Sequence, residues 1–149
     1  MKNCVCEVFK SPFRSFEDLV ARCELSQSSA AKELVELRVI PQSWLTIRQC
    51  KTCGSLFAEE FPFSESHGGG PACIYAIETT SVDEWIRLYE PLTPQIRRTH
   101  EDKSFLKSLG DEVGPEKCHR DSCSRLRIRN GVLCRSHHFE MIKGRVYAA

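Results

Sequence analysis

Nine cysteines in a chain of 149 residues constrain the fold more than any other feature of the sequence. Their number is odd, so complete disulfide pairing would leave one thiol over. The N-terminal segment lacks the apolar stretch of a secretory signal, which predicts a protein of the reducing cytoplasm. Metal binding explains several of the cysteines better than disulfides, because thiolates bind zinc strongly and a zinc site stabilises a small core.

The composition is that of a globular protein of one or two small domains, with 41% hydrophobic and 28% charged residues. No apolar run approaches the roughly 18 residues of a membrane span, so we expect no membrane partner. The charge is unevenly spread. Residues 117–145 carry eight basic residues against Asp121 and Glu140, which gives +6, whereas the whole chain carries only +1. A basic C-terminal module thus follows a mildly acidic body.

The C-terminal module has the spacing of a four-ligand metal site. Cys118 and Cys123 form one close pair, and Cys134 and His137 form a second, in the order Cys-x4-Cys-x10-Cys-x2-His. Two close pairs of sulfur and nitrogen ligands suit a tetrahedral structural zinc site. His138 is an alternative fourth ligand, since either adjacent histidine satisfies the pattern.

The ten residues between Cys123 and Cys134 predict a hairpin, because alternating apolar residues precede the turn-forming dipeptide Asn130-Gly131. Such a hairpin would bring Cys134 back beside the first pair of ligands. His137 would then lie in the first turn of a helix that ends near Gly144.

Residues 118–138 resemble the small zinc-knuckle modules of bacterial and phage proteins, which have the form Cys-x4-Cys, basic hairpin, Gly-x-x-Cys-x2-His. The resemblance covers under a fifth of the chain. It implies a zinc-stabilised fold but no particular activity.

The basic hairpin offers a candidate surface for a partner. On a strand, alternate residues share one face, so Leu126 and Ile128 would point into the module and the arginines would point outward. Such a row suits phosphates or a carboxylate-rich protein, although a solvated edge strand is the plainer interpretation. The candidate partner-binding residues are Arg120, Arg125, Arg127, Arg129 and Arg135.

A second metal site is predicted around Cys50-Lys51-Thr52-Cys53-Gly54, which is typical of the first knuckle of a zinc ribbon. A glycine after the second cysteine allows a left-handed turn. The same Cys-x-x-Cys pair could instead be a redox site. The strand-like sequence on both sides disfavours that interpretation, because redox motifs of this kind precede a helix.

The ligands that complete this second site are less constrained by the sequence. His67 and Cys73, on either side of a glycine-rich loop, are the preferred pair, and Cys4 with Cys6 is an alternative. The run from Trp44 through this loop to the following strand is loosely similar in layout to bacterial zinc-ribbon proteins of the toxin-immunity type.

The sequence predicts an α+β fold. Residues 15–24 and 29–38 are expected to form a helical hairpin, with a helix-turn-helix as the less favoured alternative because the second helix is not basic. A zinc-ribbon-like antiparallel sheet that includes a strand over 72–77 would follow, then helices from Ser81 and over 94–108, and then the zinc knuckle. The expected domains are residues 1–109 and 115–149.

No nucleophile–base pairing, phosphate loop or pair of catalytic carboxylates is recognisable, so the sequence favours a non-enzymatic protein. The preferred hypothesis is a zinc-binding protein-interaction protein, for example of the immunity type, whose acidic body faces a basic partner. The alternative is a nucleic-acid-binding protein that uses the basic C-terminal module. An enzyme is the least favoured class.

Overall fold

The structure is a computed structural model, and it describes residues 3–64 and 70–148. The chain divides into two compact units, residues 1–97 and 98–149. This division falls earlier than the boundary expected between residues 109 and 115. The cause is that residues 98–108 pack on the C-terminal segment: Phe105 lies 5.9 Å from Phe139 between ring centroids, and Asp102 accepts a hydrogen bond of 2.7 Å from Arg145.

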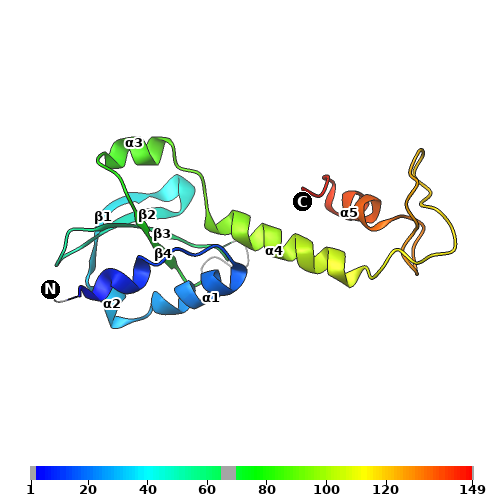
Figure 1. The fold of residues 1–149 in the computed structure, drawn as a ribbon. Helices are drawn as coiled ribbons and strands as arrows, with labels where there is room; N and C mark the ends of the chain where they lie inside the picture. Colours follow the sequence, from blue (N-terminus) through cyan, green and yellow to red (C-terminus); the bar gives the residue numbers. More distant parts are fainter. Residues whose placement is uncertain (1–2, 65–69, 149) are drawn as a thin grey trace. The chain divides into compact units, whose positions relative to one another are not determined.

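A four-stranded antiparallel sheet forms the centre of the first unit (Figure 1). Its strands lie in the order of the sequence, β1 (Leu34–Ile40), β2 (Leu45–Cys50), β3 (Leu56–Glu60) and β4 (Cys73–Ile77). The predicted mixture of helices and sheet is confirmed, and β4 is the strand expected over 72–77. The Cys-x-x-Cys motif lies at the turn between β2 and β3, also as expected.

Helix α1 (Phe16–Leu25) begins where the sequence predicts. The Ser15 hydroxyl accepts a hydrogen bond of 3.1 Å from the Asp18 backbone N–H, and the Asp18 carboxylate accepts one of 3.3 Å from the Ser15 N–H. This reciprocal capping box satisfies two backbone donors that a helix start otherwise leaves free. Helix α3 (Val82–Arg87) is capped in a similar way, because the Ser81 hydroxyl accepts from Glu84 N–H at 3.3 Å.

The predicted second helix over 29–38 is wrong, and with it the helical hairpin. Helix α2 (Ser29–Lys32) is one turn long, and the chain then enters strand β1. The pairing of β1 with β2 overrides the helical spacing of the apolar residues. A bulge between Glu36 and Arg38 interrupts this pairing on the edge strand, and such bulges discourage edge-to-edge association.

Residues on both faces of the sheet are buried, because successive strand residues point to opposite sides. One buried cluster includes Ile47, Ala58 and Tyr75 together with residues of α1. The other joins Phe57 and Ile74 to the 3-10 helix η1 (Val5–Phe9) and to α2. The elements that precede β1 are thereby held against the sheet, with α1 on one face and with η1 and α2 on the other.

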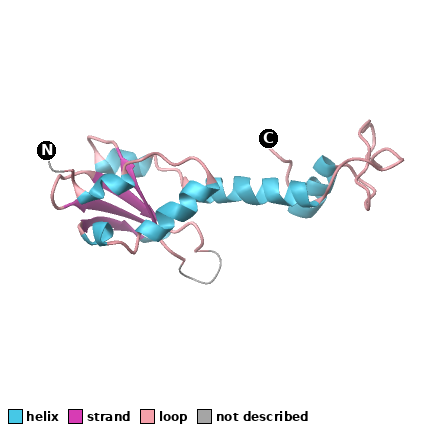
Figure 2. Ribbon diagram, turned by 60° about the horizontal axis from the view of Figure 1, so that its bottom comes forward, coloured by secondary structure: helices cyan, strands magenta, loops and turns pink. Residues whose placement is uncertain are grey.

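Helix α4 (Thr93–Ser108) continues from the first unit into the second, and α5 (Arg135–Lys143) follows later in the chain. Figure 2 shows mainly loops between these two helices. Helix α5 ends at Gly144, whose φ of 67° is the left-handed conformation common after a helix. Among the described residues, no helix combines the length and apolar character needed to cross a membrane.

Candidate metal centres

The first candidate metal centre brings together Cys4, Cys6, Cys50 and Cys53. All four sulfur atoms lie within 4.8 Å of one another, with Cys4 Sγ 3.4 Å from Cys50 Sγ and Cys6 Sγ 3.3 Å from Cys53 Sγ. A tetrahedral zinc ion with zinc–sulfur bonds of about 2.3 Å would separate its sulfur ligands by about 3.8 Å. The group therefore has the dimensions of a four-thiolate site.

Two elements distant in the sequence position these sulfurs. Cys4 and Cys6 come from the start of η1, whereas Cys50 ends β2 and Cys53 lies in the turn that follows. The turn is closed by hydrogen bonds of 2.9 Å, one from Gly54 N–H to Cys50 O and one from Cys50 N–H to Ser55 O. Gly54 has a φ of 74°, which confirms the left-handed turn expected after the motif.

The environment of this centre separates its thiols by acidity. Hydrogen bonds with the side chain and the backbone of Ser55 lower the pKa of the exposed Cys53 thiol to about 6. Burial raises the pKa of Cys6, and its contacts with Cys53 and the other cysteines raise it further. Close thiols that cannot all ionise by themselves are the usual situation at a thiolate metal site, where the positive ion supplies the missing stabilisation.

The structure corrects the preferred completing pair of this site. Cys73 is fully buried in the cluster that includes Ile47, and its thiol is hydrogen-bonded to that of Cys23, which raises the pKa of Cys73. It lies on β4 one residue from Ile74 and faces the opposite side of the sheet from Cys50. His67 lies outside the described residues. The alternative pair, Cys4 and Cys6, is the one that reaches the knuckle.

The second candidate centre consists of Cys118, Cys123, Cys134 and His137, the four residues predicted from the C-terminal spacing. His137 Nδ1 lies 3.3 Å from Cys118 Sγ and 3.4 Å from Cys134 Sγ, and Cys123 Sγ lies 4.0 Å from Cys134 Sγ. A tetrahedral zinc ion would separate a sulfur and a nitrogen ligand by about 3.6 Å. The donor set and its spacing thus fit a site with three thiolates and one imidazole.

A short antiparallel contact and a turn bring the two ligand pairs together. Cys118 N–H donates to Arg125 O at 2.8 Å, next to an isolated bridge between Lys117 and Leu126. The turn at Asn130-Gly131 is closed by a hydrogen bond of 3.0 Å from Ile128 N–H to Leu133 O. The chain returns as predicted, but without regular strands.

His137 and His138 have different surroundings, and only His137 belongs to the group of possible ligand atoms. His137 lies in the first turn of α5 beside the sulfurs, whereas the His138 ring lies 6.5 Å from the ring of Phe105 between centroids.

The acidity of Cys118 is set by two opposing effects. Burial acts to raise the pKa of Cys118, but backbone hydrogen bonds from Cys134 and Arg120 and the contact with His137 lower it to about 6.

The predicted arginine row is largely paired with carboxylates of the same unit. The pairs join Arg125 to Glu112 at 2.7 Å, Arg127 to Glu116 at 3.1 Å and Arg120 to Glu140 at 3.1 Å. Within the part of the chain that the structure describes, Arg129 and Arg135 form no ion pair. Of the two residues expected to point inward, Ile128 is buried, but Leu126 is 43% exposed.

Glu112 is a residue that the sequence analysis missed, because it lies in a stretch that looks like a linker. Its carboxylate accepts from Arg125 Nε and from the Arg135 backbone N–H, both at 2.9 Å, and it raises the pKa of Arg125. Arg135 is the first residue of α5, where a negative charge is favourable. Glu112 therefore links the loop between the ligand pairs to the helix that carries His137.

No family model, curated protein or solved structure matches the chain.

Proposed function

We propose that the chain binds two structural zinc ions, one in each unit, and works as a non-enzymatic protein-interaction protein. The observation that carries the proposal is the presence of two separate groups of four cysteine or histidine ligand atoms, each group within 4.8 Å. Tetrahedral sites of sulfur and imidazole ligands suit zinc, and a site of four thiolates also suits iron.

A structural role follows from the number of ligands. Four protein ligands occupy every position of a tetrahedral ion, so no position remains for a catalytic water. The first ion would join the N-terminal segment to the turn after β2, and the second would hold the loops of the C-terminal unit to α5. Because each unit is small, such ions would contribute directly to its folding free energy.

An exposed tryptophan supports a protein partner. Trp44 is 56% exposed and has a φ of 51°, an unusual conformation for a bulky residue. It lines an apolar groove of about 280 Å³ with Val39 and Phe61. Exposed tryptophans beside apolar pockets are frequent anchors of protein interfaces, and strained backbone is frequent at functional sites.

The nucleic-acid alternative has less support, since three of the five candidate arginines are already paired with carboxylates. A phosphate would have to compete with those partners. The immunity-type role and the cytoplasmic location stay predictions, and a toxin gene next to the gene for this chain would favour the former.

The test is the metal content of the full chain, purified without added metal and analysed by plasma mass spectrometry. We expect two zinc ions per chain. The double variant Cys50→Ser/Cys53→Ser should retain one, and Cys118→Ser/Cys123→Ser should also retain one. As a matched control, Cys23→Ser/Cys73→Ser alters two cysteines outside both groups and should retain two.

Cobalt substitution then distinguishes the two sites. The variant that keeps Cys4, Cys6, Cys50 and Cys53 should show the stronger sulfur-to-cobalt absorption, because that site has four thiolates rather than three. If the first site contains iron, the proposed zinc ion of that site is wrong, but its four-thiolate ligand set stands. A wild-type chain without bound metal would contradict the proposal.

A further inference from the structure

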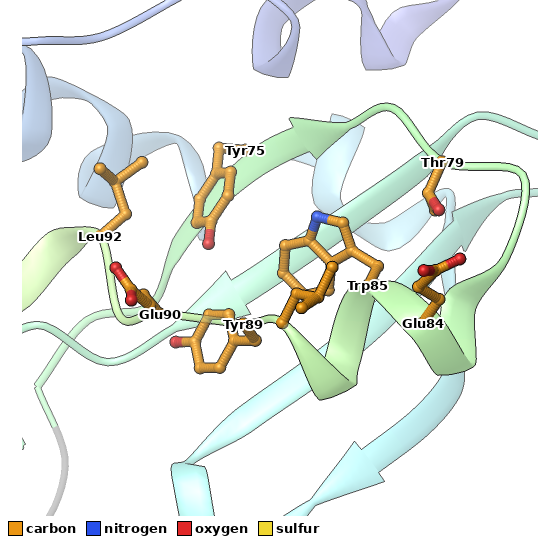
Figure 3. Close-up of a pocket in the computed structure, with 8 residues that line it drawn as sticks. Tyr75, Thr79, Glu84, Trp85, Tyr89, Glu90 and Leu92 are labelled. Carbon is orange, nitrogen blue, oxygen red and sulfur yellow. The ribbon is translucent and has the colours of Figure 1, made fainter.

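A pocket beside α3 is lined by aromatic and acidic side chains. It has a volume of about 500 Å³, within the usual range of ligand sites. Its aromatic lining is Tyr75, Trp85 and Tyr89, and Figure 3 shows Glu84 and Glu90 on opposite sides of these rings. The lining residues that remain are Thr79, Leu88 and Leu92.

A buried carboxylate lies next to two of the aromatic residues. Glu60 is 3% exposed, and its side chain accepts hydrogen bonds from Tyr75 Oη at 2.8 Å and from Tyr89 Oη at 2.6 Å. It also accepts from the backbone N–H groups of Leu92, at 3.2 Å, and Thr93, at 2.8 Å. All four of these donors are uncharged, so they hold the carboxylate without neutralising it.

The two tyrosines remain neutral donors. Burial and the adjacent Glu60 raise the pKa of Tyr75, and the same two causes raise the pKa of Tyr89. A phenol that donates to a carboxylate gains electron density on its ring, and the negative face of such a ring attracts cations.

The charged residues of the lining also favour a cation as the ligand. Glu84 and Glu90 are exposed at the pocket, and no lining residue is basic. Arg87 lies 3.5 Å from Glu84, but both side chains are more than 60% exposed, so solvent screens this pair. The pocket therefore combines aromatic rings with an excess of negative charge.

The spacing of the rings selects the shape of the cation. Trp85 and Tyr89 have centroids 5.3 Å apart and planes inclined by 37°. A cation held between two rings needs about 7 Å, two contacts of about 3.5 Å each, so no group fits between these two. A planar group stacked on one ring fits better, and guanidinium both stacks on aromatic faces and pairs with carboxylates.

We propose that this pocket binds the side chain of an arginine from a basic protein segment, stacked on the aromatic lining and paired with Glu84 or Glu90. The source of the arginine rests on the proposed function, because that function supplies a protein partner from which the basic segment would come. The recognition of guanidinium itself can be tested without the partner.

The experiment uses the full chain with Trp44→Phe, which leaves Trp85 as the only tryptophan of the two in the sequence. Its fluorescence is followed during titration with N-acetyl-arginine amide, and separately with N-acetyl-lysine amide. We expect a saturable change with arginine and at least threefold weaker binding of lysine. Glu84→Gln/Glu90→Gln should weaken arginine binding about three- to tenfold.

The matched control is Glu17→Gln/Glu24→Gln, which removes two exposed carboxylates from α1 and should leave the affinity within about twofold. Three results would overturn the inference: no saturable change, equal binding of lysine, or equal loss of affinity in the control. Metal content is measured in every variant. An unchanged metal content with no arginine binding would reject the pocket and leave the two-metal proposal intact.

Discussion

Neighbouring residues of a helix point in directions about 100° apart, so a metal at the start of α5 can take only one of two adjacent histidines. His137 Nδ1 lies within 3.4 Å of two sulfurs, and the His138 ring lies beside Phe105 instead. The spacing in the sequence admitted both residues because it carries no information about the rotation of the helix.

His137→Ala should therefore lose one metal equivalent, and His138→Ala should keep it. The reason is that the first change removes a ligand and the second removes only a ring contact with Phe105. Metal content per chain, measured with both purified variants, checks this prediction. Loss of metal in His138→Ala alone would move the ligand to that residue.

The hydrogen bonds of Glu60 predict that Glu60→Gln lowers the stability of the fold by a large amount. In Glu60→Gln an NH2 group replaces one carboxylate oxygen and cannot accept from Thr93 N–H or from the tyrosines. We expect a loss of about 2–4 kcal/mol in the free energy of unfolding, measured with denaturant. Glu36→Gln, on the exposed edge strand β1, should change it by less than about 0.5 kcal/mol. Equal effects would mean that the hydrogen bonds of Glu60 contribute little.

At the scale of elements, the sequence predicted the helix starts that neighbouring residues determine. The capping box of Ser15 and Asp18 fixed the start of α1, and Ser81 fixed that of α3. The stretch 29–38 has apolar residues that suit a helix, but Val35, and Val39 just after the stretch, also suit a strand. Pairing with β2 decided between the two, and a single sequence does not reveal such a partner.

Two glycines with the same backbone conformation provide a prediction for the knuckle. Gly54 has a φ of 74° and Gly110 one of 73°, and a Cβ at either position would meet no atom closer than 3.9 Å. Replacement of either by alanine should cost about 1–2 kcal/mol of backbone strain. Only Gly54→Ala should weaken zinc binding by the first site, measured by competition with a chelator. Equal zinc affinity in both variants would show that the turn is not needed for the site.

For the whole molecule, the two centres differ in how far the sequence revealed them. All candidate ligands of the second lie within residues 118–137, so their spacing alone predicted the group. The first joins residues 46 positions apart, Cys4 and Cys50, through the folding of the N-terminal segment onto the sheet. Cys73 is nearer to Cys50 in the sequence than Cys4 is, but its side chain lies on the opposite face of the sheet.

The pairing of charges within the second unit makes a prediction about nucleic acids. Arg120, Arg125 and Arg127 are paired with Glu140, Glu112 and Glu116, respectively. This leaves Arg129 and Arg135 as the candidate residues without an ion pair in the described chain. We expect weak binding, because the remaining body is acidic. Any binding that occurs should depend on Arg129 and Arg135, because their side chains are not paired with carboxylates in the described chain.

Labelled DNA and RNA titrated at several salt concentrations distinguish the two pairs. Each phosphate contact contributes a slope of roughly 0.9 on duplex DNA and about 0.7 on single strands. Arg129→Ala/Arg135→Ala should therefore lower the slope by about 1.4–1.8 units, with zinc content unchanged. The matched variant Arg125→Ala/Arg127→Ala should leave the slope almost unchanged, because its side chains are occupied by carboxylates. A loss of slope confined to this matched variant would show that phosphate displaces the two glutamates, and nucleic acid would then replace a protein as the favoured partner of the basic module.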